Sequence, residues 1–198
     1  YILAPRFQRL LYMSNAGNSV STYAQPILQT LTTHFNQTVF VAQLFDFEVR
    51  SVAMAFPNSA DQAYIQPGRV MPTHAAASAK AIWAFQDESK IELILKNERL
   101  KFSKHTIVEE DNVRAEFERV RQRGYAICNQ EMGNGLLSYA CPADIEGTGV
   151  IFSIAVVGTV PSIKKYPRNE IISSLREATQ EFARSYPASL GKITDIQR

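Results

Sequence analysis

Cysteine and histidine are scarce in this chain of 198 residues, which contains two cysteines and three histidines. Cys128 and Cys141 lie in apolar segments, with no CxxC spacing and no histidine nearby, and this pattern is typical of small buried hydrophobic residues. The histidines lack the mutual spacing of a metal site, and His74 is better explained by capping or packing at a helix start. We therefore expect no metal ion, no cofactor and a reducing compartment, the cytoplasm.

The sequence also lacks an excess of either charge and any long apolar run. Lys and Arg total 21 against 19 Asp and Glu, so the net charge of +2 is too small to supply a phosphate-binding face. The longest apolar run, Val150 to Val157, is much shorter than the roughly 20 residues that a membrane-spanning helix needs. We expect a soluble chain that has no membrane partner and does not itself bind DNA.

Motifs of nucleophilic catalysis are missing as well. The chain has no G-x-S-x-G motif, no supported Cys/His/Asn grouping and no paired carboxylates at the ends of strands. A missing motif is weaker than a disproof, so a small-molecule hydrolase stays open as an alternative. We predict that the protein is not an enzyme, and we assign no catalytic residue.

What the chain does contain is enough apolar material for one domain. Hydrophobic residues make up 45% of it, which suffices for a real core and a short appendage. The chain begins with Tyr1 and has no secretory signal pattern, which indicates a cut point inside a longer protein. We divide it into an N-terminal appendage (1–15), one body (16–187) and a C-terminal tail (188–198).

The first part of the chain predicts two helices, a hairpin and a long loop. Apolar spacing predicts a short helix from Pro5 to Met13, a turn at Ser14–Asn18 and an amphipathic helix from about Ser21 to Phe35. The proline-containing segment Pro57–Pro72 predicts a loop able to wall a pocket, with one short strand near 63–65. Between them, two Val- and Phe-rich segments predict paired strands at Thr38–Phe45 and Val49–Phe56.

The second part predicts helices alternating with strands. Residues 74–81 are small, so the backbone can approach a sheet or a ligand closely. Glu109–Arg123 is the clearest helix, with an acidic first turn, a basic last turn and Gly124 where a left-handed cap belongs. Further helices are predicted from Asp87 to about Asn97 and at Asn169–Ser185, and strands at Tyr125–Asn129, Leu136–Asp144 and Val150–Gly158. This order predicts an α+β fold with helices on an antiparallel-rich sheet.

Several small motifs follow one another between residues 123 and 158. Arg123-Gly-Tyr-Ala126 is followed by Gly135, by Ala140-Cys-Pro142 and by an apolar strand that ends at Gly158. From Gly124 to Gly158, these motifs align with the pattern given next without any insertion or deletion. This order resembles the effector-binding domain of the IclR family of bacterial transcriptional regulators, where R-G-Y-A precedes P-G, A-A-P-V and a strand ending S-x-S-G-P. Two more segments fit the family. Tyr1–Arg6 is similar to its Y-x-L-G-P-R, where the DNA-binding wing ends and the linker helix starts, so the appendage (1–15) would be the end of that wing and the linker helix. Pro72–Ala81 is similar to its P-x-H-x-x-x-x-G-K-A.

The resemblance implies a GAF-like fold, in which helices flank a central antiparallel sheet and an N-terminal linker helix leads into it. It implies a transcription regulator that binds a small-molecule effector and forms a homodimer or homotetramer. Operator DNA would be reached only through a winged helix-turn-helix domain that is absent from this chain. A GAF-type sensory module that regulates an attached enzyme stays open as a further alternative.

The resemblance also implies which residues contact the effector. The family's polar contacts fall on Ser138, which keeps a hydroxyl, and on Cys128, Ala155 and Val157, which have none. The family's small-residue turn, which supplies backbone N–H groups, falls on Ala77 and Ser78. The implied effector-binding residues are Met71, Ala77, Ser78, Cys128, Leu136, Ser138, Ala155 and Val157.

The strand that carries two serines in the family has Ala155 and Val157 here. This change removes two donors that a buried small carboxylate would need, and it adds apolar surface worth ~25 cal/mol per Å² buried. We therefore predict a larger and more apolar effector, such as an aromatic acid, amide or ketone, with its polar end at Ala77, Ser78 and Ser138. Because Ala155 and Val157 share one face of their strand, both should line the pocket if one does.

Overall fold

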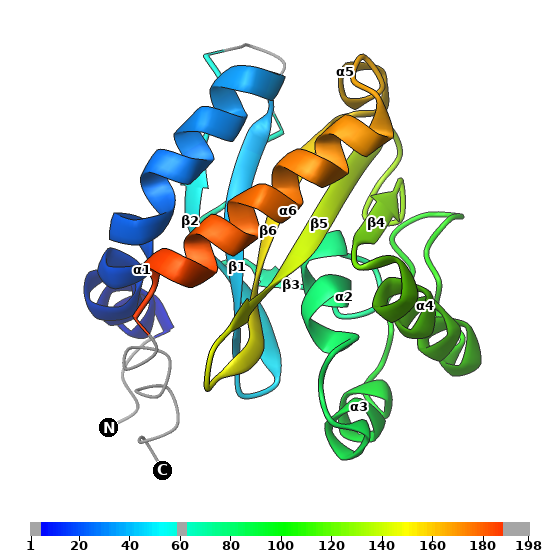
Figure 1. The fold of residues 1–198 in the computed structure, drawn as a ribbon. Coiled ribbons are helices and arrows are strands. Elements are labelled where there is room, and N and C mark those ends of the chain that lie inside the picture. The colour runs from blue at the N-terminus through cyan, green and yellow to red at the C-terminus, as the bar shows by residue number, and fades with distance from the viewer. Residues whose placement is uncertain (1–4, 59–62, 188–198) are drawn as a thin grey trace.

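The structure is a computed structural model that describes residues 5–58 and 63–187, with side chains from residue 20 onward. Its helices and strands follow one another as shown in Figure 1. In chain order they are α1 (Pro5–Phe35), β1 (Thr38–Phe45), β2 (Glu48–Ala55), β3 (Val70–Met71), α2 (Ala77–Trp83), α3 (Glu88–Leu95), α4 (Glu110–Arg123), β4 (Ala126–Asn129), β5 (Leu136–Ile145), β6 (Gly149–Thr159), α5 (Val160–Ile163) and α6 (Arg168–Ser185).

All the strands join one antiparallel sheet in the order β3-β2-β1-β6-β5-β4. The hairpin β1–β2 joins the two Val- and Phe-rich segments that were predicted to pair, and β5–β6 forms a second hairpin of strands adjacent in sequence. The central pairing of β1 with β6 joins the two halves of the chain, for example at Phe40 and Ala155. The predicted α+β fold, an antiparallel sheet flanked by helices, is confirmed.

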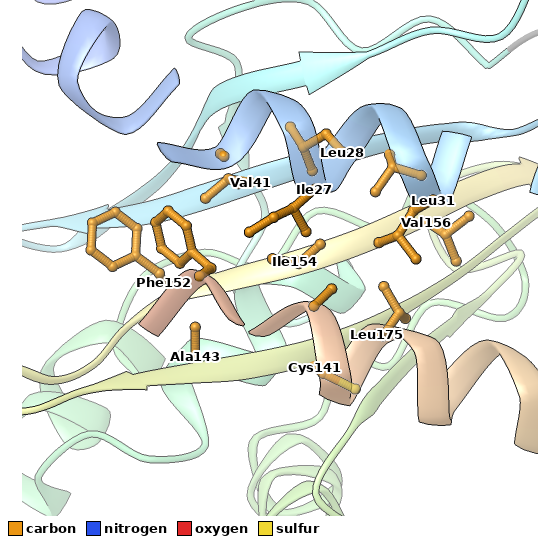
Figure 2. Close-up of a cluster of buried hydrophobic side chains, with 14 of the residues drawn as sticks. Ile27, Leu28, Leu31, Val41, Cys141, Ala143, Phe152, Ile154, Val156 and Leu175 are labelled. Atoms are coloured by element: carbon orange, nitrogen blue, oxygen red, sulfur yellow. The ribbon is translucent and has the colours of Figure 1, made fainter. Parts of the chain in front are cut away.

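The two faces of the sheet carry different helices (Figure 1). α1 and α6 cover one face, while α2 packs on the other with α3 and α4 beyond it. Along β6 the side chains alternate, so Ile154 and Val156 join the α1/α6 cluster and Ala155 and Val157 join the α2 cluster. Figure 2 shows the first cluster, where Leu28 of α1 and its neighbours pack over the β-strand side chains.

α1 is one uninterrupted helix of 31 residues, so the predicted turn at Ser14–Asn18 is wrong. A glycine inside a helix costs about 1 kcal/mol, and elongation of a helix that has already formed adds one hydrogen bond for each residue fixed. Leu28 and Leu31 bury against the sheet and anchor the helix there. The boundary at residue 15 therefore falls within a continuous helix and stays a prediction. The expected wing segment (1–4) and the tail (188–198) lie outside the described residues.

The segment between β2 and α2 differs from the prediction. Ala63–Ile65 is not a strand, and the Thr38 hydroxyl donates to the Ala63 carbonyl (2.7 Å) at this point. The short strand is β3 instead, because Val70 and Met71 pair with residues of β2. A turn follows in which the Pro72 carbonyl accepts hydrogen bonds from the N–H groups of Ala75 and Ala76. This turn leads the chain directly into α2.

Candidate functional site

A cavity of about 260 Å³ lies on the α2 side of the sheet. It is lined by Phe40, Ala63, Tyr64, Ile65, Arg69, Met71, Ala76, Ala77, Ser78, Cys128, Met132, Leu136, Ser138 and Val157. This set includes seven of the eight residues predicted as the effector site, and Ala155 is the exception. The structure therefore brings together, in one hollow, residues from Phe40 to Val157, which are 117 positions apart in the sequence.

Cys128, Ser138 and Val157 form one row across the sheet, which we call the floor of the cavity. Cys128 pairs with Ser138 between β4 and β5, and Ser138 pairs with Val157 between β5 and β6. Residues that pair directly on neighbouring strands present their side chains on the same face, so these three lie side by side. The floor offers one hydroxyl group, one thiol and one branched alkyl group, which makes it mainly apolar.

Ala155 lies in the next row along the sheet. It pairs with Ala140 on β5 and with Phe40 on β1, and it is fully buried in the same cluster as Ala79 of α2. The expectation that Ala155 shares a face with Val157 is confirmed by this clustering. The expectation that both line the cavity is wrong, because the small side chains of Ala140 and Ala155 let α2 pack directly on this part of the sheet, and only Phe40 of this row lines the cavity.

The beginning of α2 forms one wall, where Ala76, Ala77 and Ser78 line the cavity. The Ser78 hydroxyl is buried and has no hydrogen-bond partner among the described residues. The position of Ser78 is fixed from below, because the Ser153 hydroxyl of β6 donates to the Ser78 carbonyl (3.0 Å). An unpaired buried hydroxyl is costly, so a molecule in the cavity that bonds to Ser78 would remove that cost.

Another wall comes from the segment that precedes α2, and the sequence did not reveal most of it. Tyr64 is 65% exposed and stacks on Phe56, with ring centroids 5.4 Å apart. Arg69 lines the cavity and is also exposed. The lining residues not predicted from sequence are Phe40, Ala63, Tyr64, Ile65, Arg69, Ala76 and Met132. The available signal was general, since this proline-containing segment was expected to wall a pocket.

A buried ion-pair network lies next to the cavity. The Lys80 ammonium, on a fully buried side chain of α2, lies 2.8 Å from both carboxylate oxygens of Glu131 and 3.8 Å from one oxygen of Glu116. Glu116 is also bonded by Arg119 (2.9 Å) and Arg123 (2.7 Å) of its own helix, α4. Because Glu131 immediately precedes the cavity-lining Met132, the network connects the part of the cavity lining around Met132 to α2 and α4.

The two carboxyl groups of this network differ in their acidity. Burial raises the pKa of Glu131 above its ordinary value, and the positive charge of Lys80 offsets this only in part. Burial acts in the same direction on Glu116, but Lys80 and Arg123 outweigh it and hold the pKa of Glu116 below its ordinary value. Among the described residues, Glu131 thus depends on Lys80 alone for its ion pair, whereas Glu116 has three cationic neighbours.

The surroundings of Cys128, Cys141 and His74 are typical of structural residues and not of reactive ones. Burial, reinforced by Glu131, raises the pKa of the Cys128 thiol, so this group is neutral at physiological pH and a poor nucleophile. Cys141 lies on the other face of the sheet (Figure 2), and burial raises its pKa to about 12. The His74 ring stacks on Phe102 and donates from Nε2 to the Leu100 carbonyl (2.9 Å), since a carbonyl can only accept.

Within residues 5–58 and 63–187, no three His, Cys, Asp or Glu side chains converge as a metal site would require. Among the helices described, none combines the length and the apolar character needed to cross a bilayer.

Sequence comparison identifies relatives of this domain. The family model described as "Bacterial transcriptional regulator IclR C-terminal" matches residues 14–184. The probable transcriptional regulator SauR of Cupriavidus necator is 25% identical over 175 residues, which span 88% of this chain and 69% of SauR. An HTH-type transcriptional regulator of Haemophilus influenzae is 22% identical over 169 residues, or 81% of this chain and 62% of that protein.

Solved structures share the fold at low sequence identity. IclR of Thermotoga maritima has a TM-score of 0.79 at 21% identity, covering 93% of this chain and 74% of that one. An IclR homolog of Microbacterium hydrocarbonoxydans complexed with 4-hydroxybenzoate has a TM-score of 0.80 at 17% identity, covering 93% and 75%. A double mutant of the PobR inducer-binding domain of Acinetobacter, complexed with 3-hydroxybenzoic acid, has a TM-score of 0.73 at 23% identity, covering 83% and 98%. The family suggested by the sequence motifs is thus confirmed, and the chain belongs to the IclR family of bacterial transcriptional regulators as its C-terminal, effector-binding domain.

Proposed function

We propose that this domain binds a small, mainly apolar effector in the cavity of about 260 Å³ and thereby controls operator binding. A winged helix-turn-helix outside this chain would read the operator, and the regulator would act in the cytoplasm as a homodimer or homotetramer. The observation that carries the proposal is a mainly apolar cavity in which the buried Ser78 hydroxyl has no partner in the described part of the chain.

A monocyclic aromatic molecule suits this cavity better than a small oxoacid. Met71 and Val157 offer apolar surface whose burial favours binding by ~25 cal/mol per Å². Glyoxylate would leave much of that surface uncovered and would find few donors for its charge. The hydroxybenzoates bound by two structural relatives are of the proposed size. One polar group of the effector would lie at Ala77, Ser78 and Ser138, as the family positions suggest.

Calorimetric titration tests the proposed ligand class. We expect at least one of benzoate, 4-hydroxybenzoate, benzamide and acetophenone to bind this chain with a stoichiometry of about one and a negative heat-capacity change, which marks burial of apolar surface. Glyoxylate and pyruvate should bind far more weakly. Tight binding of glyoxylate or pyruvate without binding of any aromatic probe would overturn the proposal.

Ser78→Ala tests the polar end of the site. The Ser78 hydroxyl has no partner among the described residues, so its removal should leave the melting temperature of the free domain unchanged or slightly raised. Loss of one neutral hydrogen bond to the effector, about 0.5–1.5 kcal/mol, predicts roughly 2- to 12-fold weaker binding by calorimetry.

The matched control for this prediction is Ser153→Ala. Ser153 is equally buried and its hydroxyl donates to the Ser78 carbonyl, but Ser153 does not line the cavity. It should lower the melting temperature and change affinity less than Ser78→Ala does. Equal affinities of Ser78→Ala and the unchanged chain for the tightest aromatic probe would refute the role of Ser78.

A catalytic role receives less support than a binding role. The only thiol in the cavity is that of Cys128, whose raised pKa keeps it protonated, and His74 uses its ring N–H on the Leu100 carbonyl. Neither residue forms part of a nucleophile–base pair. The relatives described above are named as regulators, which favours the same conclusion.

The alternative, a sensory module attached to an enzyme, predicts a different kind of domain upstream of Tyr1. We expect the reading frame upstream of Tyr1 to encode roughly 60 to 80 residues with a helix-turn-helix pattern, since such domains are of that size. α1 is the natural coupling element, because one continuous helix would join that domain to the sheet. An upstream enzyme domain would support the alternative instead.

A further inference from the structure

Arg69 differs chemically from every other residue that lines the cavity. It is the only charged side chain among the described lining residues. Because it both lines the cavity and is exposed, it lies at the opening. Met71, two residues later in the same extended segment, is buried and lines the cavity too, which fits two side chains on one face of the chain.

The backbone of Arg69 is held firmly against the sheet. Its N–H donates to the Ser51 hydroxyl (3.2 Å) and to the Gln66 carbonyl (3.1 Å), and the Ser51 N–H donates to the Arg69 carbonyl (3.1 Å). Ser51 is a buried residue of β2, so a rigid strand sets the position from which the Arg69 side chain extends. A side chain mounted in this way loses less conformational freedom when it binds a ligand.

The guanidinium of Arg69 makes no ion pair or hydrogen bond with any residue that the structure describes. Other arginines do, since Arg50 pairs with Glu48, Arg114 with Glu110 and Arg123 with Glu116. A guanidinium keeps its charge at any physiological pH and offers a planar fork of donors that matches a carboxylate. At the opening of an apolar cavity, this group is suited to the anionic end of a bound molecule.

The cavity therefore has two polar points on different segments. One is the uncharged start of α2, where the Ser78 hydroxyl has no partner among the described residues, and the other is Arg69 in the segment that precedes α2. The mainly apolar floor of Cys128, Ser138 and Val157 lines the same cavity. A flat ring with a carboxylate on one edge can place that charge at Arg69 while its body covers the floor.

We propose that Arg69 is the counter-ion of the effector and selects an aromatic monoanion over its uncharged isostere. The inference rests on the proposed function, because it requires an aromatic molecule in this cavity. It goes beyond that function by fixing the charge of the effector and the residue that recognises it. The Ser78 hydroxyl then bonds a second, uncharged substituent.

Benzoate and benzamide are the probes for this proposal, since they have the same ring and differ in charge. Each is titrated calorimetrically into the unchanged chain, Arg69→Gln, Arg69→Lys and the control Arg184→Gln, at low and high salt. Arg184 is an exposed arginine of α6, on the far face of the sheet, so it matches the charge change without touching the cavity. Circular dichroism and melting curves confirm that each variant is folded.

We expect the unchanged chain to bind benzoate at least tenfold more tightly than benzamide. Arg69→Gln should weaken benzoate about tenfold and leave benzamide within about twofold, because only benzoate loses a charged partner. Arg69→Lys should recover part of the loss, Arg184→Gln should change neither probe, and added salt should weaken benzoate only while residue 69 is cationic.

Two results would overturn the proposal in distinguishable ways. If both probes bind and Arg69→Gln changes their affinities equally, or changes neither, Arg69 is not the counter-ion although the aromatic site stands. If neither probe binds the unchanged chain, and the other aromatic probes also fail, the proposed aromatic function fails together with this inference.

Discussion

Replacing Lys80 with Met should lower the free energy of unfolding by about 3–5 kcal/mol, the usual cost of removing one partner of a buried ion pair. The Lys80 ammonium is 2.8 Å from both carboxylate oxygens of Glu131, and no other cation pairs with that carboxylate among the described residues. Met fills a similar volume, so the loss arises mainly from the uncompensated charge of Glu131. Urea denaturation at pH 7.5, followed by circular dichroism, measures it.

The pH dependence of this loss has a definite sign. Burial raises the pKa of Glu131 in the folded chain, and removal of Lys80 should raise it further. A carboxyl group whose pKa is raised on folding favours the folded state when protonated, and that contribution is lost as pH rises through the folded pKa. The difference in unfolding free energy between Lys80→Met and the unchanged chain should therefore shrink from pH 7.5 to pH 5.

The control for Lys80→Met removes both charges. The double variant Lys80→Met, Glu131→Leu should recover most of the lost stability, since an apolar pair often replaces a buried ion pair without loss. Glu116 keeps Arg119 and Arg123 in either variant. The free energy of unfolding of Lys80→Met could lie within about 1 kcal/mol of that of the unchanged chain, or the double variant could be no more stable than the single one. Either result would show that the Lys80–Glu131 pair does not stabilise the cavity lining around Met132.

Val157→Phe should reduce the affinity for aromatic probes by at least 100-fold while leaving the fold intact. Val157 belongs to the floor of the cavity, and the larger ring would occupy space that we assign to the effector. A ligand at 100 times its dissociation constant stabilises the folded state by about 2.7 kcal/mol, and this effect should vanish in the variant. Melting curves with and without 4-hydroxybenzoate, together with calorimetry, measure the change.

The adjacent residue provides a matched control. Val156 points to the opposite face, where α1 and α6 pack tightly over it (Figure 2). Val156→Phe should therefore overpack that core and cost about 1–3 kcal/mol of stability without filling the cavity. The folded fraction of this variant should still bind aromatic probes. The assignment of the cavity fails if Val157→Phe binds 4-hydroxybenzoate as tightly as the unchanged chain does.

Local chemistry was sufficient wherever a short segment decides its own structure. Gly124 has a φ of 74°, which is the left-handed conformation predicted for a glycine at the end of α4, a helix with an acidic start and a basic end. The apolar strands were predicted within a few residues of their bounds, because a strand of alternating or continuous apolar residues has few other stable states in water. Motif order between residues 123 and 158 was sufficient for the family.

The sequence failed where the outcome depends on contacts between distant segments. The turn expected at Ser14–Asn18 is helical, because cooperative elongation outweighs the weak preferences of a few turn-forming residues. Alternation placed Ala155 and Val157 on one face, yet of these two only Val157 lines the cavity, since α2 packs over Ala155. Nothing in the spacing of Lys80 and Glu131 revealed that they form a buried pair.

The sequence by itself determined the family, the α+β class and seven of the residues that line the cavity, because those features follow from local patterns and from motif order. Only the tertiary structure decided that Arg69 lies at the opening, that Ser78 has a buried hydroxyl without a partner among the described residues, and that Ala155 is covered. The physical reason is that a pocket is enclosed by side chains from separate elements, and their relative positions are fixed by packing, which no single segment encodes.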